Sequence, residues 1–345
     1  MKANAKSRAR SLITVGFVLG TITAAAVSVA ACTTETEKKD QGSNEGIGLT
    51  QIVPVSQAPE AAMPVDATPS PDGTEIYFIA FSSRADADNL KMERVPAIYR
   101  VAATGGAPQK LFEGEPLQSP FGITISDDGQ TLFIADSSAD GDAESERSDG
   151  RVFSMPAGGG APAALAGTEG ITPAGVEALG PSLYITGRKD GKAGLFKTGT
   201  SGGGVSPVVV GGPFTDPGGV AVARDGVAYV IDTGSAVGSQ ALGSVIKVMP
   251  DGKTEVILEG LSVGHPAGIA LVNDDSAILV SALDPAQGTD RVYRIELGDR
   301  SVKQLSATIG DFYESAGLHR ARNTEVFAWA DSHANGTGTV YVLKP

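Results

Sequence analysis

The sequence has a single cysteine, Cys32, among its 345 residues, so no internal disulfide can hold the fold. It also has no HExxH and no CxxC pair. Two segments fit GxSxG, at residues 199–203 and 260–264, but both fall between predicted strands and not at a turn from a strand into a helix. No glycine-rich phosphate loop follows a strand and opens a helix. Enzymes built on those devices are therefore disfavoured, and the folded part has to be stabilised by its packed core.

The first 31 residues have the pattern of an export signal. Four basic residues precede an apolar run from Leu12 to Ala31 that has no acidic residue. The run ends in Val29-Ala30-Ala31-Cys32, which resembles the signal of bacterial lipoproteins. That resemblance implies cleavage before Cys32 and attachment of a lipid to it. An uncleaved membrane anchor is the alternative, since about 20 apolar residues can span a bilayer. Both interpretations place the folded part outside the cytoplasm.

Residues 32–48 are polar and charged and have no aromatic side chain, which predicts a flexible tether. Thr33 after the cysteine, in place of Asp, resembles an outer-membrane sorting signal if the host has two membranes. Without the 4 basic residues of the leader, 23 basic residues face 40 acidic ones, a net charge of −17. Such a surface repels nucleic acid and anionic membranes, so we expect no nucleic-acid partner and membrane contact only through the N-terminal lipid.

A pattern repeated six times fills the rest of the chain: a Gly-aliphatic step, a tight turn and a short aliphatic run. Successive copies are 56, 53, 44, 49 and 49 residues apart, a spacing typical of one small sheet per repeat. The aligned positions are Asp66, Gly122, Gly175, Gly219, Gly268 and Gly317.

Each repeat continues into two more predicted strands. Segments such as AIYRVAA and RVFSMPA alternate apolar with polar residues, turns rich in Gly and Asp follow, and short apolar runs such as QKLFEG come next. Asp72-Gly73, Asp128-Gly129 and Asp225-Gly226 are interpreted as turns between first and second strands. Four antiparallel strands in each of six units predict an all-β, six-bladed β-propeller over residues 49–345.

The sixth repeat has a predicted third strand at residues 339–345 but no fourth one. The segment from Gly48 to Val55 has the length and apolar content to fill that place. We therefore expect the N-terminal strand to complete blade six, which would remove an exposed sheet edge.

The loops that lead into the first strands gather on one face around the channel, the default ligand site of such a ring. The aligned residues just before these strands are Met63, Ser119, Thr172, Asp216, His265 and Glu314. Three of them, Asp216, His265 and Glu314, are candidate ligands of a divalent cation such as calcium. His265 and Glu314 are also the candidate catalytic acid-base pair, and Ser119 and Thr172 are candidate ligand contacts. The alternative roles are a turn cap for Asp216, a hydrogen bond to a backbone carbonyl for His265 and a solvated loop charge for Glu314.

One layer deeper the alignment places Glu177 and His319 on blades three apart, so we expect them to face each other across the axis. They would bind a small ligand or order a network of water. Trp329 precedes the loop from Asp331 to Gly336, and it is expected either to contact a sugar or peptide at the rim or to pack between blades.

The predicted loop between the second and third strands of blade two is densely acidic. A calcium site would suit such carboxylates, although their spacing does not match an EF-hand loop, and a mobile acidic loop is the alternative. The acidic residues are Asp136, Asp140, Asp142, Glu144, Glu146 and Asp149.

The pattern Pro-x-Gly-Ile/Val, followed by a turn and Leu-Tyr/Phe-Ile, resembles the repeats of the NHL and gluconolactonase-like (senescence-marker) superfamily of six-bladed propellers. Ser70-Pro71-Asp72-Gly73 also resembles the WD40-like repeats of the periplasmic TolB type. The gluconolactonase resemblance implies calcium or zinc in the channel, held by an acidic residue and by asparagines. The matching positions cannot ligate a metal here; they are Phe121, Ala174, Gly218, Ala267 and Ala316.

Two functions are therefore expected to compete. The first is a lipid-anchored module of the cell envelope that binds a protein, peptide or glycan. The second is a metal-assisted lactonase-like hydrolase or lyase that acts in the channel through Asp216, His265 and Glu314. In residue type, His265 and Glu314 resemble the pair of virginiamycin lyase-like propellers. A purely structural envelope module is a third possibility.

Overall fold

The computed structural model describes residues 51–56, 61–85, 92–138, 150–234, 242–264, 267–284, 289–305 and 315–344. Within these ranges the regular structure is β, apart from short 3-10 segments such as η2 (Ala334–Gly336). The described residues include no helix with the length and apolar character needed to cross a membrane.

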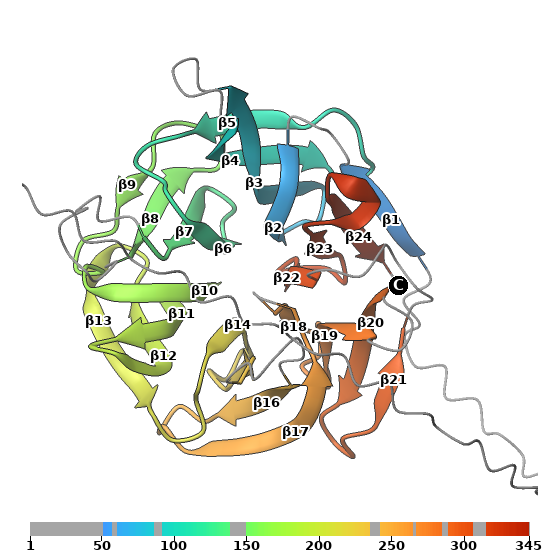
Figure 1. The fold of residues 1–345 in the computed structure, drawn as a ribbon. Coiled ribbons are helices and arrows are strands. Elements are labelled where there is room, and N and C mark those ends of the chain that lie inside the picture. The colour runs from blue at the N-terminus through green and yellow to red at the C-terminus, as the bar shows by residue number, and fades with distance from the viewer. Residues whose placement is uncertain are drawn as a thin grey trace, which may run out of the picture. The chain divides into compact units, whose positions relative to one another are not determined.

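Six four-stranded antiparallel sheets form the blades of a ring (Figure 1). Innermost strand first, blades one to three are β2 (Ala62–Pro69), β3 (Glu75–Ala85), β4 (Met92–Ala102), β5 (Gln109–Glu113); β6 (Pro120–Ile125), β7 (Thr131–Asp136), β8 (Arg151–Pro156), β9 (Ala163–Ala164); β10 (Ile171–Leu179), β11 (Ser182–Lys189), β12 (Lys192–Gly199), β13 (Gly202–Val210). Blades four to six are β14 (Pro217–Val222), β15 (Ala228–Asp232), β16 (Leu242–Val248), β17 (Thr254–Ser262); β18 (Ile269–Leu271), β19 (Ala277–Asp284), β20 (Thr289–Glu296), β21 (Val302–Gln304); β22 (Ser315–Arg320), β23 (Phe327–Asp331), β24 (Thr339–Lys344), β1 (Gln51–Ser56). The six-bladed β-propeller predicted from the repeats is confirmed.

The last blade is completed by the N-terminal strand, as predicted. Strand β1 pairs antiparallel with β24, in a register that runs from Gln51 opposite Lys344 to Ser56 opposite Val340. The two ends of the folded part therefore share one sheet, and the outer edge of β24 is covered.

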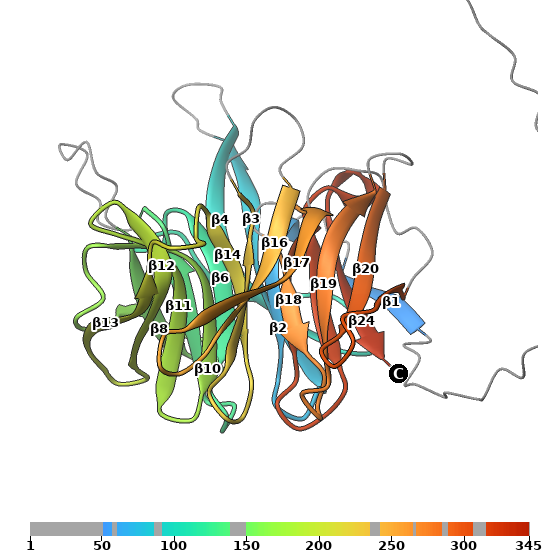
Figure 2. The same ribbon diagram turned by 90° about the horizontal axis from the view of Figure 1, so that it is seen from below.

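The innermost strands all begin at one face of the ring, here called the upper face, and end at the lower face (Figure 2). The turns from first to second strands lie on the lower face. Gly73, Gly129 and Gly226 in these turns have φ angles of 73°, 72° and 85°, the left-handed region that glycine adopts without a steric penalty. The Asp-Gly turns predicted from the sequence are confirmed.

The core lies between neighbouring blades. Phe78 and Tyr99 of blade one stack with ring centroids 5.4 Å apart, and they pack against small residues of blade six such as Ala328 and Ala330. Large side chains on one sheet thus fill the space that small ones leave on the next. Each fully buried large apolar side chain contributes about 1.5–3 kcal/mol, so the six interfaces between blades supply most of the stability.

The repeated glycine of the inner strands is needed for close approach between blades. A Cβ atom on Gly175 would lie 2.6 Å from the carbonyl oxygen of Gly218, and one on Gly219 would lie 2.4 Å from that of Ala267. Real Cβ atoms do not come so near to backbone, so any other residue would push neighbouring blades apart. These glycines therefore set the narrow bore of the channel.

Replacing Gly219 with alanine is expected to lower the free energy of unfolding by about 1–3 kcal/mol, because the added methyl group overpacks the contact between blades four and five. Gly218→Ala is the matched control, since its Cβ would have no neighbour closer than 3.4 Å. Urea denaturation followed by circular dichroism would measure both. Equal stability of the two variants would contradict the close-approach explanation.

Candidate functional site

In blade one an aspartate occupies the position that is glycine in the other five repeats. Asp66 is 3% exposed, and its Oδ2 accepts a hydrogen bond from the backbone N–H of Ile123 in blade two at 2.7 Å. A Cβ on Gly317 of blade six would lie 1.6 Å from Asp66 Oδ1, so this glycine makes room for the carboxylate. Asp66 is one of the aligned repeat positions but had no predicted role, although an acidic residue among five aligned glycines was a usable signal.

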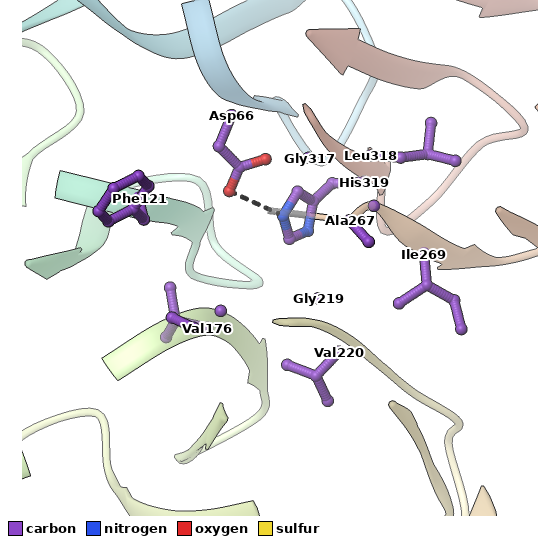
Figure 3. Close-up of a pocket in the computed structure, with 13 residues that line it drawn as sticks. Asp66, Phe121, Val176, Gly219, Val220, Ala267, Ile269, Gly317, Leu318 and His319 are labelled. Carbon is purple, nitrogen blue, oxygen red and sulfur yellow. Dashed lines mark hydrogen bonds and ion pairs between the residues drawn. The ribbon is translucent and has the colours of Figure 1, made fainter. Parts of the chain in front are cut away.

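His319 joins Asp66 to Glu177 across the channel. Its Nε2 lies 3.2 Å from Asp66 Oδ2, the contact drawn as a dashed line in Figure 3, and its Nδ1 lies 3.1 Å from Glu177 Oε2. Asp66, Glu177 and His319 come from blades one, three and six and are called the channel triad below. Glu177 and His319 thus face each other as predicted, and they are in direct contact, without the small ligand or water that the sequence suggested between them.

Both ring nitrogens of His319 face a carboxylate oxygen, and both can donate only in the protonated imidazolium. Burial by itself would lower the pKa of His319, but the charge and hydrogen bond of Asp66, together with Glu177, outweigh it and raise the pKa to about 10. Burial would likewise raise the pKa of Glu177, yet the hydrogen bond from His319 and the charge of Arg322 hold it below its ordinary value. His319 is therefore protonated and Glu177 ionised at neutral pH.

Arg322 extends this network toward the lower face. Its Nη2 lies 3.2 Å from Glu177 Oε1, and its Nε lies 2.9 Å from Asp127 Oδ1 in the turn of blade two. Thr124 adds a hydroxyl that donates to Glu177 Oε2 at 3.3 Å. The network ties blades one, two, three and six together through the axis.

The channel triad lies between two hollows of the channel. The upper hollow has a volume of about 260 Å³ with its open mouth included, and its lining is mostly small or apolar apart from Asp66 and His319. The lower hollow, of about 270 Å³, is lined by Glu177, Arg320 and Arg322 beside small and aliphatic residues. His319 lines both, so a ligand that entered from the upper face would meet a polar floor whose groups already bind each other.

Three of the residues predicted at the upper rim lie in the described part of the chain, and each has its own contacts or place in a strand. Ser119 donates its backbone N–H to Asp136 Oδ1 at 3.0 Å. Thr172 is the second residue of β10 and does not precede that strand. Asp216 is half-exposed, accepts a hydrogen bond from the hydroxyl of Thr233 at 3.1 Å and lies 3.8 Å from Arg188 Nη2.

Other predicted site residues fall outside the described ranges. These are Cys32, His265 and Glu314, so the lipidation site, the catalytic pair and the metal set with Asp216 stay predictions. Within the part of the chain that is described, no group of three or more His, Cys, Asp or Glu side chains is arranged to hold a metal ion.

Of the six acidic residues considered for calcium in blade two, only Asp136 lies in the described part. It is fully buried and accepts backbone hydrogen bonds from Gln118 at 2.8 Å and Ser119 at 3.0 Å, so it fastens the loop before β6. Burial raises the pKa of Asp136. Asp232 fastens the corresponding loop of blade four, where the N–H of Thr215 donates to it at 2.8 Å. The loop-fastening role of these residues was missed, although both stand at the same place after a β run.

Trp329 requires a correction. It is fully buried between blades five and six and stacks on Tyr341 with ring centroids 5.1 Å apart. A rim contact with sugar or peptide is therefore wrong for this residue, and packing between blades is what the structure shows. The side chains of alternate strand residues point to opposite faces of a sheet, and Trp329 falls on the face toward blade five.

No protein-family model matches the chain, and no curated protein matches its sequence. Solved structures resemble it in fold. TolB from Acinetobacter baumannii has a TM-score of 0.50 and 10% identity over 82% of this chain and 55% of that one. A TolB-designated protein from Agrobacterium tumefaciens has a TM-score of 0.54 and 16% identity over 85% and 97%. The GH74 enzyme from Niastella koreensis has 0.52 and 14% over 80% and 46%.

The chain thus spans about half the length of the Acinetobacter TolB. At these identities the likeness concerns the fold alone, and it places this chain among β-propellers with TolB-like structural neighbours. Membership of the NHL and gluconolactonase-like superfamily stays a prediction.

Replacing His319 with alanine is expected to cost about 3–5 kcal/mol of stability, because it leaves Asp66 and Glu177 buried without their shared cation. His319→Gln removes the positive charge but keeps a polar side chain that can still form hydrogen bonds. Because the pKa of His319 rises from 6.5 to about 10 on folding, its stabilisation is complete below pH 6.5 and is lost as pH rises through about 10. The difference between wild type and His319→Gln should therefore shrink from pH 6 to pH 10 in urea titrations.

His333→Gln, the same change outside the channel triad, is the control for that titration. A stability difference between wild type and His319→Gln that stayed constant from pH 6 to pH 10 would show that His319 is not held as a cation.

Proposed function

We propose that this protein is a lipid-anchored β-propeller of the cell envelope that binds a protein, peptide or glycan at the upper mouth of its channel. The anchor follows from the export signal and Cys32, and residues 32–48 would hold the propeller away from the membrane. In a diderm host, Thr33 favours the outer membrane.

One observation carries the proposal: the titratable groups inside the described channel are buried and bind each other, whereas Arg188 and Asp216 on the upper face are paired but keep 44% and 42% of their side chains exposed. Asp66, Glu177 and His319 form a closed set of hydrogen bonds at the channel floor. A buried group used in this way is poorly placed to transfer protons to a substrate. The described part of the channel thus favours recognition over catalysis.

The upper mouth presents an aromatic and a charged pair. Phe121 is half-buried and lines the upper hollow. Arg188 and Asp216, whose side chains are 44% and 42% exposed, lie on blades three and four, and the Arg188 guanidinium also donates to the carbonyl of Thr215. Aromatic and arginine side chains dominate binding energy at protein interfaces, and charged rim residues add specificity. A peptide or glycan with both apolar and polar groups fits this combination.

The likeness in fold to TolB proteins is compatible with a binding module. The GH74 enzyme has a similar fold as well, so architecture alone does not separate binding from catalysis. The acidic surface supports partners other than nucleic acid.

Replacing Arg188 with glutamate is expected to weaken partner binding by about thirtyfold or more, the size typical of a central interface residue. Phe121→Ala should weaken it as well, because it removes the aromatic contact. The measurement is affinity capture from detergent-solubilised envelope extracts with the full chain, followed by biolayer interferometry with the captured partner.

Lys253→Ala is the control, since this side chain is 81% exposed in a turn of blade four on the outer part of the ring. It should bind like the wild type. Partner capture that is unchanged by both Arg188→Glu and Phe121→Ala would refute the binding function. Robust turnover of lactones, with only nonspecific capture of proteins, would refute it as well.

A further inference from the structure

The interface between blades five and six contains two buried aspartates that face each other. Asp290 lies on β20 and Asp331 on β23, and both are 0% exposed. Val292 and Trp329, each two residues away on the same strand face, pack in the apolar cluster between these blades. The carboxyl groups of Asp290 and Asp331 are close enough for a hydrogen bond, yet two ionised carboxylates have no hydrogen to share.

Asp331 uses only one of its two carboxylate oxygens in the hydrogen bonds of the described residues. Its Oδ1 accepts hydrogen bonds from the backbone N–H groups of His333 at 3.1 Å and Ala334 at 2.9 Å. Its Oδ2 and both carboxylate oxygens of Asp290 are buried and have no hydrogen-bond partner. Three unpartnered acceptor oxygens therefore belong to two neighbouring buried side chains.

The corresponding aspartates of other blades show that this is unusual. Asp136 and Asp232 stand at the same place at the end of their second strands, and both oxygens of each accept backbone N–H groups. Neither has a second buried carboxylate beside it among the hydrogen-bond and ion-pair contacts of the described residues. Holding the preceding loop thus accounts for both carboxylate oxygens of Asp136 and Asp232. For Asp331, its backbone hydrogen bonds account for only one oxygen, and nothing comparable accounts for the burial of Asp290.

A buried carboxylate without a partner is costly, and a like-charged neighbour adds to the cost. Burial and the proximity of Asp331 raise the pKa of Asp290 to about 10, so without another cation Asp290 keeps its proton at neutral pH. Within the described residues neither aspartate has an ion-pair partner. One shared proton would supply one hydrogen for three oxygens and leave a net charge of −1. A divalent cation would neutralise both groups and contact all three oxygens.

We propose that Asp290 and Asp331 bind a hard divalent cation of the calcium class between blades five and six. Calcium prefers carboxylate oxygens and completes its shell with backbone oxygens or water. This site is separate from the channel and from the predicted set of Asp216, His265 and Glu314. It would join blade five to the blade that closes the ring, so its role is to lock the ring.

The first test is metal-dependent stability of the full chain, purified with EDTA and dialysed free of metal. Adding CaCl₂ alone should raise the Tm of the wild type by about 2 °C or more, increasing with calcium concentration. Asp290→Asn should abolish that rise. In metal-free buffer the same variant should be at least as stable as the wild type, because the new amide can donate a hydrogen bond to Asp331 without a bound proton, and this shows that it folds.

Asp232→Asn is the matched control, since it alters the equivalent aspartate of blade four, whose oxygens are already used. It should lower Tm but keep the response to calcium.

The second test uses Trp329, the sole tryptophan of the chain, as a local reporter. It lies two residues before Asp331 on the same face of β23, so a Tb³⁺ ion bound as a substitute for calcium should luminesce when the indole is excited. Calcium should displace that signal, and Asp290→Asn should remove it. Trp329→Phe should remove the signal and keep the thermal response to calcium.

Two results would overturn the proposal. In one, the wild type gains no stability from Ca²⁺, Mg²⁺ or Mn²⁺, and Asp290→Asn is as stable or more stable in all buffers, as a shared proton predicts. In the other, the metal response persists unchanged in Asp290→Asn and Asp331→Asn, which would place the cation elsewhere.

Discussion

The close approach of the innermost strands is the constraint on which the rest of the structure depends. Glycine allows neighbouring blades to touch through their backbones. A Cβ on Gly219 would lie only 2.4 Å from the carbonyl oxygen of Ala267, so no room is left for a side chain. A bore this narrow brings side chains from opposite blades into direct contact. His319 can therefore reach Asp66 and Glu177 at once, which a wider ring would not permit. The packed interfaces between blades keep this geometry rigid.

Most of the architecture could be predicted because a repeat multiplies weak local signals. The Asp-Gly turns, the strand count and the pairing of β1 with β24 all followed from patterns that recur or from the one place where a pattern stops short. Single positions were harder. The local sequence around Trp329, or around the aspartates that end the second strands, does not tell whether the side chain faces solvent or a neighbouring blade. Only the register of the sheet determines that.

The channel shows the same difference between repeated features, which the sequence predicts, and single contacts, which it does not. Alignment placed Glu177 and His319 at one depth, but the length of their side chains and the position of Asp66 determined that they would meet directly. The sequence could not show that the charges would cancel inside the molecule. That cancellation turns two candidate ligand-binding residues, Glu177 and His319, into a link between blades. In the described part of the channel, Phe121, Arg188 and Asp216 on the upper face are then the side chains accessible to a partner.

The shared blade also governs how the molecule can reach its folded state. Among the described strands β1 is the first and its partner β24 is the last, so this pairing has a sequence separation of nearly 300 residues. Contacts between such distant segments form slowly, because a long loop has to close before they contribute. Until then β24 has an open edge that could accept β1 from a second copy of the chain. Ring closure is therefore the step at which concentration decides between a monomer and an exchanged dimer.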